Sequence, residues 1–227
     1  MRFTVIFTFL LLCFTQYGFN QNQYKVINVG FYNLENLFDT LDTPRKLDEE
    51  FTPTGSRLYN TAVYTDKLFR LSSTLSKIGT DISPEGLGII GVAEIENSKV
   101  LEDLVAQPAL KERNMEIVHY ESEDFRGIDV ALLYQPKYLT VINSHPIHVP
   151  ILNSKGEKIY TRQTLYITEI MDGDTVHILV NHWPSRRGGS ASDPLRIQAG
   201  IINRTVKDSI LAVSPNAKVI VMGDLND

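Results

Sequence analysis

Five polar side chains stand out because each follows a short apolar run, either directly or within a tight turn. They are Asn33, Glu94, His182, Asp224 and Asn226. Polar side chains at the ends of buried strands converge when those ends share one edge of a sheet structure. The resulting set is rich in oxygen ligands, with one histidine and no thiolate, so it suits Mg²⁺, Mn²⁺ or Ca²⁺ better than zinc.

A divalent cation in such a set can stabilise the charge that builds on a phosphoryl oxygen during in-line attack by water. Each residue also has a structural interpretation: Asn33 could cap a turn, and Asp224 and Asn226 could form one. His182 could be a hydrogen-bonded core histidine. Glu94 has the strongest functional case, since a carboxylate directly after the run GIIGVA is costly unless it is paired or coordinated. Its neighbour Glu96 is the main competitor for that role.

The elements that position these residues are short strands separated by helices. Each strand is a β-branched-rich apolar run bounded by turn residues. We expect strands at 24–32, 87–93, 128–134, 176–180 and 218–222, and helices at 64–78, 98–106 and 192–212. This mixture indicates an α/β or α+β arrangement in which helices cover the sheets.

Two further segments carry their own expectations. Residues 39–60 are charged and poorly patterned, so we expect a mobile segment or a surface flap near the site. Residues 139–170 indicate strands and turns, with a hairpin tip at 153–156. Trp183 is expected to pack in the interior and not to stack on a base.

Five motifs occur in an order that resembles a known family. FYNLENLF, GVAEIEN, RGIDVALLY, NHWPSRRGG and VMGDLND match successive motifs of the endonuclease/exonuclease/phosphatase superfamily, and they are most similar to its bacterial secreted nuclease-like members. The match runs from about Val26 to Asp227. The resemblance implies a DNase I-like domain over 24–227, a four-layer α/β/β/α sandwich of two mixed sheets flanked by helices. Its active site would lie at one edge of the sheets.

The resemblance also implies roles for single residues. Glu94 and Asn33 would bind the metal, Mg²⁺ first with Mn²⁺ or Ca²⁺ as alternatives. Asp224 would orient or activate the attacking water, and Asn226 would position that water and the phosphate. His182 would contact the scissile phosphate and help protonate the leaving group.

Two more residues are candidates for binding phosphate. Arg186 follows His182 in a loop, where its planar guanidinium could grip a phosphate group. Tyr134, at the end of the predicted strand 128–134, is a possible phosphate neighbour.

The N-terminus is typical of a targeting segment. Arg2 precedes an apolar run that ends near Phe14, which is too short to anchor the chain permanently in a bilayer. We expect a signal peptide over 1–21 and a secreted or periplasmic protein; the alternative is a lipoprotein signal that uses Cys13. Because Cys13 is the only cysteine, the processed chain would have no disulfide.

The family pattern continues beyond the last motif of this sequence, which ends at Asp227. The resemblance implies further strands that end in an aspartate next to a histidine, the expected general base. Such a base contributes roughly 10²–10⁴-fold to the rate. We therefore expect a domain that is incomplete at its C-terminus and weakly active by itself.

Composition restricts how the chain can bind phosphate. The net charge is −5, so phosphate binding must come from a local patch or a metal. The leading hypothesis is hydrolysis of phosphodiesters in extracellular or periplasmic DNA or RNA. The alternatives are a phosphatase or phospholipase-type phosphodiesterase acting on inositol phosphate or phospholipid headgroups, and a non-catalytic binding remnant. The oligomeric state stays open.

Overall fold

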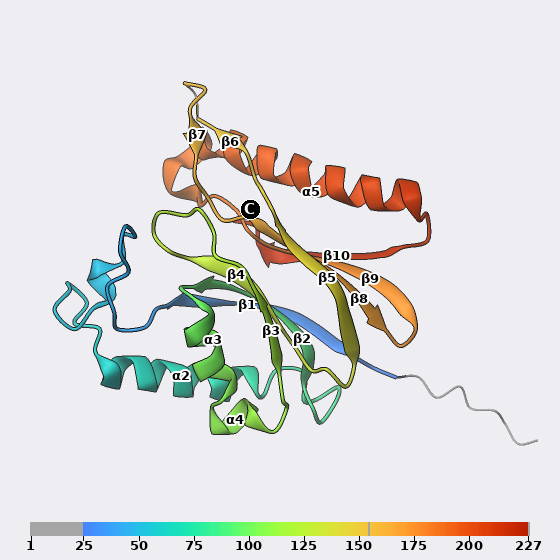
Figure 1. Ribbon diagram of the computed structural model, residues 1–227, viewed down its shortest axis with the longest axis horizontal. Helices are drawn as coiled ribbons and strands as arrows, with labels where there is room; N and C mark the ends of the chain where they lie inside the picture. Colours follow the sequence, from blue (N-terminus) through green and yellow to red (C-terminus); the bar gives the residue numbers. More distant parts are fainter. Residues whose placement is uncertain (1–24, 154, 227) are drawn as a thin grey trace, which may run out of the picture.

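The computed structural model describes residues 25–153 and 155–226, which form four layers (Figure 1). Two four-stranded sheets face each other in the middle, α2, α3 and α4 cover one of them, and α5 covers the other. This arrangement confirms the expected α/β/β/α sandwich. The proposed signal peptide at 1–21 lies outside the described residues and stays a prediction.

The first sheet has the strand order β1-β2-β4-β3. Its strands are β1 (Asn28–Leu37), β2 (Leu87–Ile95), β3 (Glu116–His119) and β4 (Asp129–Tyr134). β1 pairs with β2 in parallel, whereas β4 is antiparallel to both β2 and β3. Every residue of β4 is buried, because both faces of this central strand are covered.

The second sheet has the order β10-β9-β8-β5. Its strands are β5 (Leu139–Ile147), β8 (Thr164–Met171), β9 (Asp174–His182) and β10 (Lys218–Asp224). β10 pairs with β9 in parallel, and β8 is antiparallel to both β9 and β5. A small hairpin of β6 (Ile151–Leu152) and β7 (Lys158–Ile159) flanks the turn expected at 153–156, of which Ser154 lies outside the described residues.

Two of the helices begin at capping side chains, and two begin at a proline in the first turn. The Asn60 carboxamide accepts hydrogen bonds from the first turn of α2 (Thr61–Leu75), and Asn97 does the same for α3 (Ser98–Val105). α4 (Pro108–Lys111) is a single turn, and α5 (Asp193–Val213) has Pro194 in its first turn. Among the described residues, no helix combines the length and apolar character that crossing a membrane requires.

Apolar side chains fill the spaces on both sides of the first sheet. Ile90 and Leu133 pack toward the helices, and Ile89 and Leu132 pack toward the second sheet. The two sheets approach closely at Gly91, where an added Cβ would lie 2.5 Å from Met222 Sδ. This close approach brings β2 against β10, so their carboxyl-terminal ends come near each other.

Residues 39–60 lie mostly at the surface, as expected for a flap, but they are anchored by buried side chains. Their mobility stays a prediction. They contain the short 3-10 helix η2 (Glu49–Phe51), and the ring of Phe51 stacks on Phe38 with centroids 4.1 Å apart. Glu96 fastens the segment, because its carboxylate accepts the Asp39 N–H at 2.7 Å and the Thr43 hydroxyl at 2.8 Å. Burial raises the pKa of Glu96 to about 7.

Candidate active site

Two parallel strand pairs bring the predicted site residues to one edge of the sandwich. In the first sheet Asn33 lies opposite Ala93, next to Glu94, and in the second sheet His182 lies opposite Asp224. His182 Nε2 is 3.7 Å from a Glu94 carboxylate oxygen and 3.9 Å from Asp224 Oδ2. Residues that are far apart in sequence thus form one cluster.

The backbone at two of these residues has an uncommon conformation. Glu94 has a φ of 60° and Asn226 a φ of 54°, in the left-handed region that residues other than glycine rarely adopt. Glu94 also interrupts the register between Ala93 and Ile95, as in a β-bulge. Bulges re-aim side chains, and strained residues concentrate at functional sites. Here the bulge turns Glu94 toward His182.

Asp224 is held by two amide groups. The Asn33 Nδ2 donates to Asp224 Oδ2 at 3.0 Å, and the Asn226 backbone N–H donates to Oδ1 at 3.1 Å. The Asn33 side-chain oxygen accepts the Glu35 N–H at 2.8 Å. In this structure Asn33 therefore orients Asp224, and its role as a metal ligand stays a prediction. Asn226 also reaches the Trp183 carbonyl at 3.0 Å.

His182 is buried and neutral. Its burial, together with the positive charges of Arg162 and Arg126, lowers its pKa to about 2. Its Nδ1 is buried without a hydrogen-bond partner among the described residues. A neutral imidazole can donate one hydrogen bond and accept another at neutral pH, so its contacts with Glu94 and Asp224 are not ion pairs.

The donor set fits a divalent cation. Glu94, His182 and Asp224 each offer one ligand atom, and these atoms lie within 4.8 Å of one another. Within the described part of the chain, neither carboxylate forms an ion pair with a lysine or an arginine. Two facing carboxylates that are not in ion-pair contact with a lysine or an arginine favour a cation between them, and oxygen ligands suit Mg²⁺ or Mn²⁺.

The cluster opens into a cavity of about 530 Å³. Its wall contains four arginines and the site residues: Arg126, Arg162, Arg186, Arg187, Glu94, His182, Asp224, Asn226 and Ser185. Although the whole chain is acidic, this cavity is locally positive. Guanidinium groups bind phosphate oxygens with a planar pair of donors, so the cavity suits a phosphorylated ligand. The structure places the predicted Arg186 at this wall.

Arg162 is a part of the site that the sequence did not reveal. Its guanidinium is buried and donates to the carbonyl oxygens of His182 at 3.2 Å and Trp183 at 2.8 Å. It also forms a buried ion pair with Asp124 at 3.0 Å. A lone arginine in the segment between β7 and β8 carries no pattern, and its partner lies 38 residues earlier in the chain. Trp183 packs with residues of β6 and α5, as expected.

The structure corrects the expectation that Tyr134 contacts phosphate. Because β4 runs antiparallel to β2, Tyr134 lies opposite Ile89, at the far end of β2 from Glu94. Its ring packs between the two sheets, and its hydroxyl donates to the Glu116 carboxylate.

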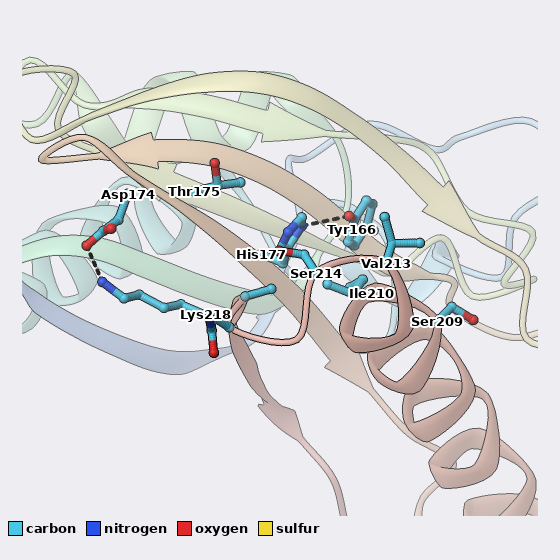
Figure 2. A pocket seen from close by; sticks show the side chains of 11 residues that line it. Tyr166, Asp174, Thr175, His177, Ser209, Ile210, Val213, Ser214 and Lys218 are labelled. Atoms are coloured by element: carbon cyan, nitrogen blue, oxygen red, sulfur yellow. Dashed lines mark hydrogen bonds and ion pairs between the residues drawn. The ribbon is translucent and has the colours of Figure 1, made fainter.

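A second cavity of about 610 Å³ lies over the outer face of the second sheet, beside the end of α5 (Figure 2). Asp174 and Thr175 line it from the start of β9, at the opposite end of that strand from His182. Asp174 is paired with Lys218, and the Tyr166 hydroxyl lies 2.8 Å from His177 Nδ1. Among the described residues, Asp174 is the one carboxylate that lines this cavity, and Lys218 neutralises it. The second cavity therefore does not have the pair of facing carboxylates that lines the first cavity.

A sequence profile described as the Endonuclease/Exonuclease/phosphatase family matches residues 28–227. The chain belongs to this family. No curated protein matches it by sequence. Membership agrees with the order of motifs and with the cluster at the ends of β1, β2, β9 and β10.

Solved structures show the same fold at low identity. A humanized TDP2 of D. rerio has a TM-score of 0.53 and 14% identity over 87% of this chain and 61% of that one. D. rerio TDP2 complexed with single strand DNA product has a TM-score of 0.50 and 15% identity over 72% and 54%. The human Nocturnin catalytic domain with bound sulfate anion has a TM-score of 0.50 and 19% identity over 70% and 58%. The chain thus spans less than two thirds of the length of each of these structures.

Proposed function

We propose that this family member is a divalent-metal-dependent phosphodiesterase that cleaves the backbone of DNA or RNA. The observation that carries the proposal is the juxtaposition of Glu94, His182 and Asp224 with an arginine-lined cavity. The carboxylates supply a place for a cation, and the arginines supply a place for the phosphate that the cation would activate.

In this mechanism Glu94, with Asp224 across the cavity, would hold the metal ion. The ion, when bound, supplies stabilisation of negative charge on the phosphoryl oxygens. Asp224, oriented by Asn33 and Asn226, accepts a hydrogen bond from the attacking water and fixes its direction.

The remaining residues act on the phosphate. His182 is already neutral at neutral pH, and its one ring N–H donates a hydrogen bond to a phosphoryl or leaving-group oxygen. Arg186 and Arg187, at the exposed rim of the cavity, bind the flanking backbone charge. Arg162 donates to the carbonyls of His182 and Trp183 and so fixes the end of β9, which carries His182.

Nucleic acid as the substrate is supported by the D. rerio TDP2 structure, which holds a single strand DNA product. We also propose that the enzyme acts outside the cytoplasm, on the basis of Arg2 and the apolar run that follows it. Fractionation of cells that express the full chain would test this: recovery of an intact N-terminus in the cytoplasmic fraction would contradict it.

Plasmid nicking by the purified chain tests the activity, with Mg²⁺, Mn²⁺, Ca²⁺ or EDTA present. We expect nicking with Mg²⁺ or Mn²⁺, none with EDTA, and a loss of about 10²-fold or more in Glu94→Gln. Glu96→Gln is the matched control, because this carboxylate lies two residues from Glu94 and binds Asp39 and Thr43 outside the cavity. Calorimetric titration with Mn²⁺ gives an independent readout, since Glu94→Gln should lose binding that Glu96→Gln keeps.

Three outcomes would contradict parts of the proposal. Equal nicking by wild type and Glu94→Gln would remove Glu94 from the site. Release of phosphate from an inositol phosphate, without nicking, would assign the other substrate class. Mn²⁺ binding with no hydrolysis of any phosphoester would favour a binding protein.

A further inference from the structure

A second chain of polar groups lies at the outer edge of the first sheet. Ser98 is the first residue of α3, His119 ends β3, and Asp129 begins β4. Ser98 Oγ is 2.9 Å from His119 Nδ1, and His119 Nε2 is 2.9 Å from Asp129 Oδ2. A hydroxyl, an imidazole and a carboxylate in this order form the arrangement that activates a serine nucleophile. None of the three belongs to the candidate active site.

The fold places these residues together for simple reasons of register. His119 lies opposite Ala131 in the antiparallel pair of β3 and β4, so it shares a sheet face with Asp129, two residues along. Asp129 in turn lies opposite Ile95, three residues before Ser98. This is the face that α3 covers.

In the neutral form of His119, the hydrogen bonds determine which ring nitrogen is the base. A carboxylate only accepts hydrogen bonds, so Nε2 carries the proton that faces Asp129. Nδ1 is then unprotonated and accepts from the Ser98 hydroxyl. Asp129 is itself held, since its Oδ1 accepts the Ser122 N–H at 2.9 Å.

Among these three residues, the base is shielded from solvent and the nucleophile is accessible to it. The side chains of His119 and Asp129 are 3% and 2% exposed, whereas Ser98 lies at the surface. Ser98 also occupies the first position of an eight-residue helix, where the partial positive charge of the helix N-terminus favours a developing oxyanion.

A metal ion is the rival occupant of this cluster. Glu121 approaches His119 and Asp129, and one ligand atom from each lies within 4.8 Å of the others. However, both ring nitrogens and both Asp129 oxygens already have hydrogen-bond partners. The geometry therefore favours the nucleophile arrangement over a metal site.

We propose that Ser98 is an activated nucleophile that attacks small, unhindered carboxylic esters. As Ser98 Oγ bonds to the carbonyl carbon, its proton passes to His119 Nδ1. The ester C–O bond then breaks, the leaving oxygen takes that proton, and an acyl-Ser98 remains. Water gives a proton to His119 as it attacks the acyl carbon, and release of the carboxylic acid returns the proton to Ser98.

The test uses the full chain in EDTA, with p-nitrophenyl acetate as substrate and a fluorophosphonate as a covalent probe. We expect the probe adduct on Ser98 by peptide mass spectrometry. Ser98→Ala should lose the adduct and at least about 10-fold of the ester hydrolysis, because it removes the nucleophile that forms the acyl intermediate. Ser209→Ala, which removes an exposed serine on α5, should change neither.

Further variants separate this activity from phosphodiester cleavage. Ser98→Ala should keep metal-dependent nicking, so loss of one activity does not report on the other. Asp129→Asn should slow adduct formation on Ser98, and its circular dichroism spectrum shows whether it is folded. No adduct on Ser98 in the wild-type chain would overturn the proposal, whatever the variants do. Zn²⁺ binding that Glu121→Gln abolishes, with Ser98 unreactive, would assign the cluster to a metal instead.

Discussion

Asn33 contacts Asp224 through its amide nitrogen, whereas a metal ligand would present an oxygen. Asn33→Asp keeps an oxygen at this position but removes the donor and sets two carboxylates side by side. If Asn33 orients Asp224, we expect both Asn33→Asp and Asn33→Ala to lower kcat by roughly 100-fold, the cost of a misplaced catalytic group. Steady-state kinetics with Mg²⁺ measures this, and a fully active Asn33→Asp would identify Asn33 as a metal ligand.

At the scale of single residues, the sequence predicted those side chains that end apolar runs. The sequence favoured Glu94 over Glu96 because a carboxylate directly after GIIGVA is costly unless it is paired or coordinated. Glu96 is in fact the more buried of the two, but its carboxylate is paired with Asp39 and Thr43, and only Glu94 lines the cavity. Arg162 was not predictable, since its role depends on the distant carboxylate of Asp124. The hydroxyl of Ser98 also follows no apolar run, so its contact with His119 appears only in three dimensions.

The buried ion pair of Asp124 and Arg162 joins the segment before β4 to the segment before β8, and Arg162 also donates to the carbonyl at the end of β9. Removing one partner leaves an uncompensated buried charge, so we expect Asp124→Asn to lower the free energy of unfolding by about 3 kcal/mol. It should also reduce nicking, because Arg162 holds the His182 and Trp183 carbonyls. Urea denaturation and the nicking rate measure the two effects.

An exposed ion pair provides the control for this prediction. Glu50 and Arg57 are about half exposed, so Glu50→Gln should cost less than about 1 kcal/mol. If Asp124→Asn lowers the free energy of unfolding no more than Glu50→Gln does, the buried pair of Asp124 and Arg162 does not stabilise the fold. The double variant Asp124→Leu with Arg162→Met should recover stability over Asp124→Asn but not the nicking rate.

At the scale of elements, most strands and helices were predictable from a periodicity or a cap, whereas β3 and α4 were not, because each has only 4 residues. The direction of each strand in its sheet was not predictable from the sequence. β1 and β2 run in parallel, as do β9 and β10, so their ends share the site. β4 runs the other way, which is why Tyr134 is remote from it. The anchoring of residues 39–60 was not predictable, because Phe51 and Tyr59 pack without any periodic pattern.

At the scale of the whole molecule, the contact between the two sheets contains one costly group. Glu169 alternates with Leu165 and Ile167 on β8, so it points into the layer between the sheets. It is 0% exposed, and neither carboxylate oxygen has a hydrogen-bond partner among the described residues. This burial raises the pKa of Glu169 from 4.5 to about 7.

The sign of the pH dependence follows from this shift. Between pH 4.5 and about 7 the folded chain keeps a proton on Glu169 that the unfolded chain has lost. The contribution of Glu169 to stability therefore falls as pH rises through this window, by about 3 kcal/mol in total. Glu169→Gln removes the charge, so it should be more stable than wild type at pH 8 and nearly equal to it at pH 4.5.

Urea denaturation at several pH values from 4.5 to 8.5 checks this prediction. The exposed Glu102→Gln should follow the wild-type curve throughout, because its side chain meets solvent in both states. Part of the pH dependence should persist in Glu169→Gln, since burial raises the pKa of Glu96 in the same direction. If Glu169→Gln and wild type were equally stable at pH 8, the carboxylate would have to be solvated when charged, and the two sheets would then admit water at this point.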